Sequence, residues 1–436
     1  MQRYERMKTD GNTDWFVKDR FGMFIHFGLY SSIARGEWVK FSEHIKDEEY
    51  NRQLKYFDPD LYDPKEWAKT AKAAGMKYAV MTTKHHDGFC MFDSKYTDYK
   101  VTNTPAGRDL IREYVEAFRA EGLKVGLYYS LIDWHHPDFT VDIAHPLCDE
   151  ENPSRYNQGR DMEKYREYLY HQVEELLTKY GKIDILWFDF SYPYDTDPKT
   201  GLSGKTKDDW GAEKLVKMIR RLQPDVIIDN RMGLDLDLWT PEQFTVQDWI
   251  RHPKTGERVT WEVCHTLSGD WGYCREEKAR KTPEMLIGLL VHSVACGGNM
   301  IMNVGPTARG CFDERDMESL KVFEEWMKYN SRSIYNCTMA EEVFQAPNGC
   351  AYTQSEDGKR LYLHLLEYPF QYVLLPKLSD RIEYAQFLHD GSQIPFEIGE
   401  IDHMHSKITG DHVAILKIPP KKPNVTVPVV EIFLRD

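Results

Sequence analysis

Long apolar runs, basic blocks and paired-cysteine motifs are all missing from this chain of 436 residues. No stretch reaches the ~18 apolar residues of a membrane span, and the N-terminal segment has no apolar core of a secretory signal. We therefore expect a cytoplasmic protein with no membrane partner. Acidic residues outnumber basic ones by 70 to 56, which gives a formal net charge of -14. This balance argues against binding to the phosphates of a nucleic acid.

The eight cysteines include no CxxC pair, and the chain contains no HExxH. Zinc sites and disulfide frameworks rely on such spacings, so we expect free thiols and no bound metal. Aromatic residues make up 13% of the chain. A sugar-binding cleft and a large aromatic core would both give this content.

Seven short apolar runs alternate with longer amphipathic stretches between about residues 20 and 330. The runs are 22–30, 77–83, 123–130, 183–190, 225–231, 259–265 and 299–304. Their nearly continuous apolarity is typical of parallel strands buried on both faces, and the stretches between them have helical caps and terminal glycines. This order predicts a (β/α)₈-like barrel, irregular because only seven runs are clear; a doubly wound sheet is the alternative.

The pattern changes near residue 337, where short alternating segments separated by turn sequences replace the helical period. Such segments predict a small antiparallel β-sandwich. We therefore expect two domains, a catalytic barrel over 1–335 and a C-terminal sandwich over 336–436.

Polar residues follow the apolar runs where a barrel builds its active site. Asp189 is the most informative, because alternation in ILWFDF places it on the same face as Trp187. A carboxylate that ends such an apolar strand is costly to bury unless a partner or a reaction uses it. The structural alternative is an ion pair with a neighbouring loop, for example with Arg231.

Two tandem pairs of histidines, His85-His86 and His135-His136, raise the hypothesis of a metal site. Adjacent residues on an extended strand point to opposite faces, so one of His85 and His86 is expected in the core and the other in the cleft. The pairs are not spaced to chelate one ion together.

Taken together, these segments resemble the family 29 glycoside hydrolases, the retaining α-L-fucosidases. The resemblance runs over about residues 14–306. It is carried, in order, by RFGMFIHFGLYS, GEW, DPKEWAKTAKAAGMKYAVMTTKHHDGFCMFDSKYTDY, GLYYSLIDWHHP, LWFDF, DNR, TPEQ, WE, WGY and GGNMIMNVGP. It implies a barrel with a C-terminal β-sandwich, in agreement with the pattern of the runs.

The resemblance also implies roles for single residues. Asp189 stands at the position of the nucleophile. The implied fucose-binding residues are His26, Glu37, Trp38, His85, His86, Tyr128, Trp187 and Arg231, and Trp271 stands where an aromatic side chain lies near the methyl group of the sugar. These types suit fucose, because imidazole, carboxylate and guanidinium groups fix hydroxyls while an apolar wall accepts the methyl.

The acid/base has two candidates. Glu242 in TPEQ matches the family position best, and Glu262 beside Trp261 is the competitor. Glu242 could instead be a solvated residue at a helix start after Pro241. Glu262 could instead support Arg231 or a histidine.

The expected function is an exo-acting retaining α-L-fucosidase that uses two carboxylates, no metal and no other cofactor, on a fucosylated glycan. Three alternatives remain. The sugar could be an α-L-galactoside or a D-arabinopyranoside, which share the hydroxyl pattern of fucose. The chain could be a non-catalytic carbohydrate-binding protein, or a metal-dependent hydrolase. The sequence predicts neither the natural linkage nor the oligomeric state.

Overall fold

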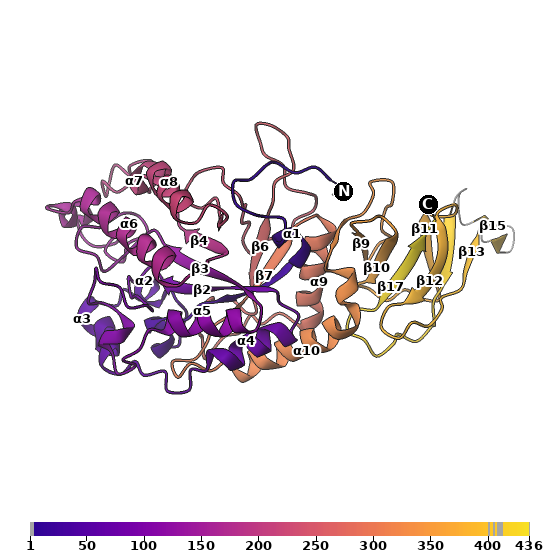
Figure 1. The fold of residues 1–436 in the computed structure, drawn as a ribbon, viewed down its shortest axis with the longest axis horizontal. Coiled ribbons are helices and arrows are strands. Elements are labelled where there is room, and N and C mark those ends of the chain that lie inside the picture. Colours follow the sequence, from indigo (N-terminus) through magenta and orange to yellow (C-terminus); the bar gives the residue numbers. More distant parts are fainter. Residues whose placement is uncertain (1–3, 400–401, 404–405, 408–412, 436) are drawn as a thin grey trace.

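A curled parallel sheet lies at the centre of the N-terminal part of the chain, and antiparallel sheets build the C-terminal part (Figure 1). The computed structural model describes residues 4–399, 402–403, 406–407 and 413–435. Over these residues the parallel sheet has seven strands, in the order β5-β4-β3-β2-β1-β7-β6. The strands are β1 (Phe21–Ile25), β2 (Tyr78–Lys84), β3 (Lys124–Ser130), β4 (Ile185–Asp189), β5 (Ile227–Ile228), β6 (Glu262–Thr266) and β7 (Asn299–Val304). Each overlaps one of the seven apolar runs.

Residues 238–243 close the sheet between its two edge strands, β5 and β6. On one side Leu238 pairs in parallel with Asp229, directly after β5. On the other side Glu242 pairs in parallel with Cys264 of β6. The segment therefore acts as an irregular eighth strand, which confirms the expectation of a (β/α)₈-like barrel with one irregular position.

Alternate residues of the strands point into the barrel, and the residues between them face the helices. One buried cluster takes members from all seven strands and from the closing segment: Phe24, Val80, Tyr128, Trp187, Ile227, Leu238, Cys264 and Ile301. Met23 and Ile25 of β1 belong instead to the core shared with Ala68 and Ala71 of the adjacent helix. Burial on both faces explains why the strands have continuous apolar sequences.

Helices cover the outside of the barrel. The longer ones in the described residues are α4 (Pro64–Ala73), α5 (Leu110–Ala120), α6 (Met162–Lys179), α8 (Ala212–Leu222), α9 (Pro283–Ala295) and α10 (Glu314–Asn330). Helix α4 shows how the sequence sets their ends: the Asp63 side chain accepts the N–H groups of Lys65 and Glu66, and Gly75 follows the helix at a φ of 87°.

Short elements complete the barrel domain. They are α1 (Phe16–Asp19), α2 (Val39–Ser42), α3 (Asp47–Tyr50) and α7 (Lys207–Trp210), with 3₁₀ turns η1 (Leu29–Ser32), η2 (Asn51–Lys55), η3 (Val101–Asn103), η4 (Pro153–Asn157) and η5 (Ser331–Ser333). These pieces have three to five residues, which are too few to show a helical period, so the sequence does not predict them.

The C-terminal part is a sandwich of antiparallel sheets, as expected. Its strands are β8 (Cys337–Met339), β9 (Cys350–Ser355), β10 (Arg360–Leu365), β11 (Tyr372–Pro376), β12 (Ile382–Phe387), β13 (Phe396–Ile398), β14 (Asp402–His403), β15 (Ser406–Lys407), β16 (Val413–Lys417) and β17 (Val429–Leu434). The sheet β12-β17-β10-β9-β8 faces the sheet β11-β16-β13. Leu363 and Val430 of the first sheet share a core with Leu375 and Leu416 of the second.

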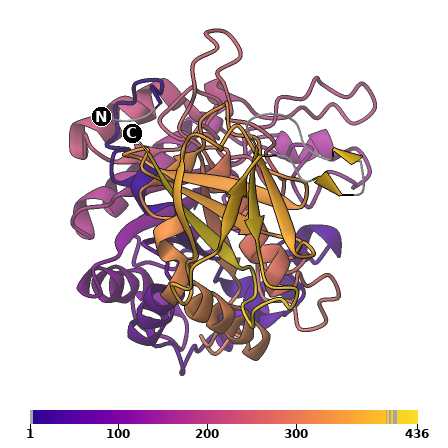
Figure 2. The ribbon, with the colours of Figure 1, turned by 90° about the vertical axis from the view of Figure 1, so that its right-hand side faces the viewer.

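The sandwich packs against α9, and the Trp326 indole of α10 donates to Val427 O, at the end of the molecule opposite α3 and α6 (Figures 1 and 2). Arg20 connects the two parts. Its guanidinium donates to the carbonyls of Cys337, at the start of β8, and of Gly297, which follows α9, both at 2.8 Å. Arg20 is only 2% exposed. The predicted boundary between residues 335 and 336 stays a prediction.

No helix among the described residues is long and apolar enough to cross a membrane. All eight cysteines are free thiols, as expected from their spacing.

Loss of the Arg20 guanidinium should destabilise the protein. In Arg20→Met the carbonyls of Cys337 and Gly297 lose their donor in a buried place, so we expect the free energy of unfolding to fall by about 2–4 kcal/mol. Urea unfolding measures the change. Arg309→Met is the matched control, because Arg309 pairs with Asp60 at the surface and should matter by less than about 1 kcal/mol. Equal unfolding midpoints for the two variants would contradict this role for Arg20.

Candidate active site

A cavity of about 50 Å³ opens at the carboxyl ends of the barrel strands. It is lined by Phe24, His26, Trp38, His85, His86, Tyr128, Trp187, Asp189, Phe190, Arg231, Glu242, Cys264 and Trp271. The structure therefore brings together all the predicted site residues except Glu37 and Glu262.

Asp189 ends β4 at the floor of this cavity and is 8% exposed. The Tyr128 hydroxyl donates to its Oδ2 at 2.8 Å, and the Arg231 guanidinium donates to its Oδ1 at 2.9 Å. His86 Nε2 lies 3.8 Å from Oδ2. Trp187 lines the same cavity, which agrees with the alternation expected for ILWFDF. Asp189 is thus a buried carboxylate with a hydrogen-bond donor on each of its two oxygens. The ion pair with Arg231 that the sequence offered as the structural alternative is present.

Arg231 joins the two carboxylates of the cavity. One terminal nitrogen binds Asp189, and the other binds Glu242 Oε2 at 2.7 Å. The guanidinium also donates to the hydroxyl and the carbonyl of Thr240, and it lies 4.4 Å above the ring of Trp187. Burial disfavours the charge, but the neighbouring carboxylates more than offset this and raise the pKa of Arg231 above its usual value.

Glu242 lies on the closing segment, and its side chain is 40% exposed. The structure excludes the alternative of a helix start after Pro241, because this part of the chain is an irregular strand. Glu242 is therefore open to solvent, whereas Asp189 and Glu262 are buried.

The histidines of the cavity are neutral at neutral pH. Burial lowers the pKa of His26 to about 4 and that of His86 to about 3. His26 Nδ1 lies 2.6 Å from Asn303 Oδ1, which can only accept, so Nδ1 carries the proton. His86 Nδ1 lies 2.7 Å from Ser130 Oγ, whose own proton is donated to Ile132 O. Both Nε2 atoms are therefore acceptors.

The predicted arrangement of His85 and His86 on opposite faces is wrong. Both rings line the cavity, with centroids 4.0 Å apart. The physical reason is that β2 ends at Lys84, so the chain has already turned and the alternation of a strand no longer applies. The His85 ring stacks on Tyr128 at 5.5 Å, with 12° between the planes.

Aromatic side chains form the walls. Trp38 meets His86 edge to face at 4.9 Å, and Trp271 lies 5.2 Å from His26. Phe190, directly after Asp189, closes the side between Trp38 and His86 with centroid distances of 5.4 and 5.1 Å. A cavity with apolar walls and few fixed polar groups suits a small polar ring that carries one apolar substituent.

Glu37 lies outside the cavity lining, behind the Trp271 loop. Its Oε2 accepts the backbone N–H groups of Trp271 at 3.0 Å and Gly272 at 2.7 Å. Burial raises the pKa of Glu37 to about 7 despite these bonds. A Cβ at Gly272 would lie 2.8 Å from Tyr30 Cδ2, so only glycine allows this approach. Glu37 holds the Trp271 wall in place, and its direct contact with a sugar stays a prediction.

Glu262 lies apart from the other candidates. It begins β6 and therefore sits near the amino end of the barrel, where it accepts a hydrogen bond from the Tyr78 hydroxyl. It is fully buried, and burial raises its pKa to about 8. Neither Arg231 nor a histidine is its hydrogen-bond partner, so the structure replaces both suggested partners with Tyr78.

Phe24, Phe190 and Cys264 line the cavity but were not predicted. Phe190 has a φ of 83°, which is unusual outside glycine and marks strain at the residue after Asp189. Cys264 Sγ lies 3.6 Å from Arg231 and from Pro241 O. The alternation of side chains along a strand was the signal that could have found two of them. It places Phe24 on the same inner face as His26, and Cys264 on the same inner face as Glu262.

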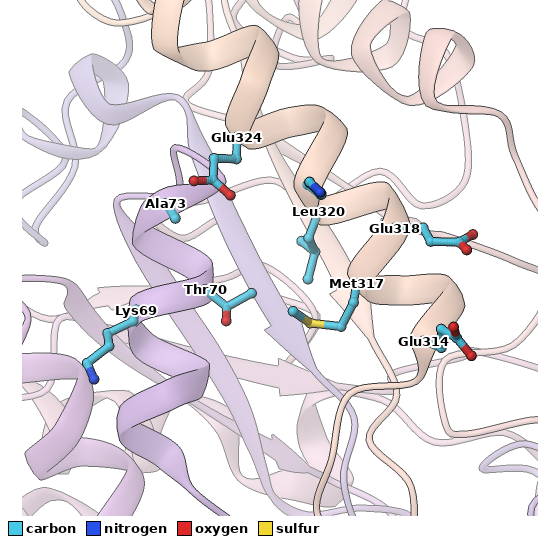
Figure 3. Close-up of a pocket in the computed structure, with 9 residues that line it drawn as sticks. Lys69, Thr70, Ala73, Glu314, Met317, Glu318, Leu320 and Glu324 are labelled. Carbon is cyan, nitrogen blue, oxygen red and sulfur yellow. The ribbon is translucent and has the colours of Figure 1, made fainter.

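Neither a metal-binding cluster nor the wide groove on the outside of the barrel offers a second candidate among the described residues. No group of three or more His, Cys, Asp or Glu side chains there is arranged to hold a metal ion. A groove of about 420 Å³ lies between α4 and α10 on the outside of the barrel (Figure 3), lined by Lys69, Thr70, Ala73, Glu314, Met317, Glu318, Leu320, Lys321 and Glu324. It contains none of the predicted residues.

Comparison with known proteins gives a consistent result. A family model described as Alpha-L-fucosidase matches residues 2–332. Alpha-L-fucosidase isoenzyme 1 from Paenibacillus thiaminolyticus is 45% identical, with a TM-score of 0.88 over 97% of this chain and 99% of that one. A GH29 alpha-L-fucosidase from Bacteroides thetaiotaomicron, trapped as a covalent intermediate, is 27% identical with a TM-score of 0.80 over 100% of both chains. Human plasma alpha-L-fucosidase is 29% identical over an alignment of 388 residues that covers 81% of this chain and 76% of that protein.

The raised pKa of Glu262 predicts how its variant responds to pH. Between the unfolded value of about 4.3 and the folded value of about 8, the folded protein keeps a proton that the unfolded chain loses, so wild-type stability falls as pH rises through this window. Glu262→Gln removes this titration and can still accept from Tyr78. The stability of the variant relative to wild type should therefore rise by about 1 kcal/mol per pH unit. Urea unfolding at about pH 5, 6.5 and 8 measures the difference, and a difference independent of pH would show that Glu262 is ionised when folded.

Proposed function

This chain belongs to the alpha-L-fucosidase family, and we propose that it releases terminal α-L-fucose by double displacement with Asp189 as nucleophile and Glu242 as acid/base. The enzyme is a retaining, exo-acting glycoside hydrolase. Its substrate is a fucosylated glycan or glycoconjugate.

The observation that carries the two roles is the bridge made by Arg231. Retention requires two carboxyl groups about 5–5.5 Å apart, one on each side of the reacting bond. A single planar guanidinium that binds Asp189 at 2.9 Å and Glu242 at 2.7 Å holds two carboxyl groups close together at the cavity. Glu262 is fully buried outside the cavity lining and cannot reach a leaving group there.

In the first step an oxygen of Asp189 attacks the anomeric carbon while the bond to the aglycone oxygen breaks. Glu242 gives its proton to that oxygen, so the aglycone leaves as an alcohol and a fucosyl ester of Asp189 remains. The hydroxyl of Tyr128 and the guanidinium of Arg231 aim the attacking carboxylate. Neutral His86 does not compete with Arg231 for the charge of Asp189.

In the second step Glu242, now ionised, accepts a proton from water as that water attacks the anomeric carbon of the ester. Asp189 leaves as a carboxylate, and the released fucose has the configuration of the substrate. The exposure of the Glu242 side chain, 40%, gives water and the aglycone access from the same side.

Sugar recognition follows from the charge states of the cavity. The Nε2 atoms of His26 and His86 are acceptors, and each ring is held by a hydrogen bond at its Nδ1, so both can accept hydrogen bonds from sugar hydroxyls while the rings stay neutral. Trp271, fixed by Glu37 and by Asn303, supplies the apolar wall for the C6 methyl group.

Replacement of Asp189 should abolish turnover of an aryl α-L-fucoside. We expect Asp189→Ala to lower kcat/KM by about 10⁴-fold or more, because the covalent step is lost. Azide should then displace the aglycone directly and give the β-fucosyl azide. With Glu242→Ala, azide should instead attack the fucosyl ester and give the α-fucosyl azide, since both inversions still occur.

The same experiment has clear contrary outcomes. Full activity of Asp189→Ala would show that the site is misassigned. NMR of the first product of wild type tests retention, and initial release of β-fucose would exclude the double displacement. If azide restores Glu262→Ala but not Glu242→Ala, the acid/base is Glu262.

The wall at Trp271 also predicts the choice of sugar. L-Galactose adds a hydroxyl at C6 and D-arabinopyranose lacks C6, so wild type should favour the aryl α-L-fucoside by about 10- to 200-fold in kcat/KM. Rates on the three aryl glycosides measure this preference. Trp271→Ala should reduce it, and a wild type faster on either relative would move the assignment to that sugar.

A further inference from the structure

Gln243, the residue after Glu242, has a φ of 50°, in the left-handed region that side chains other than glycine rarely adopt. Its N–H donates to Cys264 O at 3.0 Å. This backbone bond alone does not explain the conformation, because a relaxed strand could make it as well. Strained residues persist where surrounding contacts over-determine them, and they gather at functional sites.

The side chain of Gln243 supplies such contacts. Its Nε2 donates to Thr266 Oγ1 at 2.6 Å, and its Oε1 accepts from Lys281 Nζ at 3.3 Å. Lys281 Nζ also donates to Thr266 O at 2.8 Å, Thr266 Oγ1 at 3.2 Å and Ser268 O at 3.3 Å. Thr266 Oγ1 donates its own proton to Ser268 O. We call Gln243, Thr266 and Lys281 the clamp.

The clamp is anchored on rigid elements on one side and reaches the active site on the other. Thr266 ends β6 and is fully buried, and Lys281 comes directly before Thr282, the N-cap of α9. Gln243 is covalently next to Glu242, whose side chain forms an ion pair with Arg231 and with no other described residue. That pair has to loosen when Glu242 turns its proton toward an aglycone, so a second restraint on the residue must come from its backbone.

We propose that the clamp positions Glu242 for proton transfer, with Gln243 and Lys281 as positioning residues of the acid/base; this rests on the proposed function. Without the clamp the strained peptide after Glu242 relaxes and moves the carboxyl group away from the leaving oxygen. A displacement of about 1 Å is enough to lower a proton-transfer rate by up to about 100-fold. Sugar binding and attack by Asp189 do not depend on the clamp.

The test compares kcat/KM on two substrates, because kcat/KM reports the first step. Methyl α-L-fucoside has a poor leaving group that needs the acid, and 4-nitrophenyl α-L-fucoside has a good one that hardly needs it. We expect Gln243→Ala and Lys281→Met to lose about 10- to 50-fold on the methyl substrate and less than about 3-fold on the aryl one. Gln243→Gly should lose less than Gln243→Ala, because glycine accepts the positive φ without strain.

Glu242→Ala and Gln247→Ala are measured beside them. Gln247 lies four residues further on the same loop, and its side chain bonds only to Thr245 O among the described contacts, so Gln247→Ala should match wild type on both substrates. Equal losses of Gln243→Ala on the two substrates, or none, would overturn the proposal, and equal effects of the Ala and Gly variants would overturn the role of strain. If Glu242→Ala itself shows no dependence on the leaving group, the assignment of the acid/base has failed first and the clamp proposal falls with it.

Discussion

The Arg231 guanidinium is the group on which the arrangement of the cavity depends. It reaches Asp189 at the end of β4, Glu242 and Thr240 on the closing segment, and the face of Trp187, from a position just after β5. A planar cation that stays charged and donates in fixed directions can set the spacing of two carboxylates, whereas the point charge of a lysine cannot. The same bonds fasten the irregular segment to the barrel, so the residues that close the sheet also build the site.

The place of this bridge has a topological reason. β5 has two residues, and no helix separates it from the closing segment or the closing segment from β6 among the described residues. A regular strand there would alternate its side chains between the two faces and pair continuously with both neighbours. The bridges that replace it let Pro241 and Gln243 bend the chain, and Glu242 reaches the mouth of the cavity. The barrel therefore has its least regular strand at the position of Glu242, the proposed acid/base.

The hydrophobic periodicity of the sequence and the polar residues that follow each apolar run predicted the strands and most of the residues that line the cavity. The apolar runs identified all seven strands, and the period of two in ILWFDF correctly placed Asp189 with Trp187. The sequence did not predict the eighth, irregular strand. Residues 238–243 contain a proline and pair only through isolated bridges, so they show no apolar periodicity. The orientation of His85 and His86 failed for a related reason: periodicity does not state at which residue a strand ends. The indirect position of Glu37 depends on a loop some 230 residues away, which no local pattern records.

The sequence left Glu242 and Glu262 as competing candidates for the acid/base. The structure gives the better position to Glu242 and the raised pKa to Glu262. Glu262 has the raised pKa that a general acid is often expected to have, because its burial disfavours the charge by more than the hydrogen bond from Tyr78 favours it. It lies on the inner face below the cavity, however, and a proton that cannot reach the leaving oxygen does no catalysis. Glu242 contacts the cation that aims Asp189 and is open to solvent, through which its proton can be replaced in each turnover. A perturbed pKa is therefore a guide to burial first, and to catalysis only where the carboxyl group also faces the substrate.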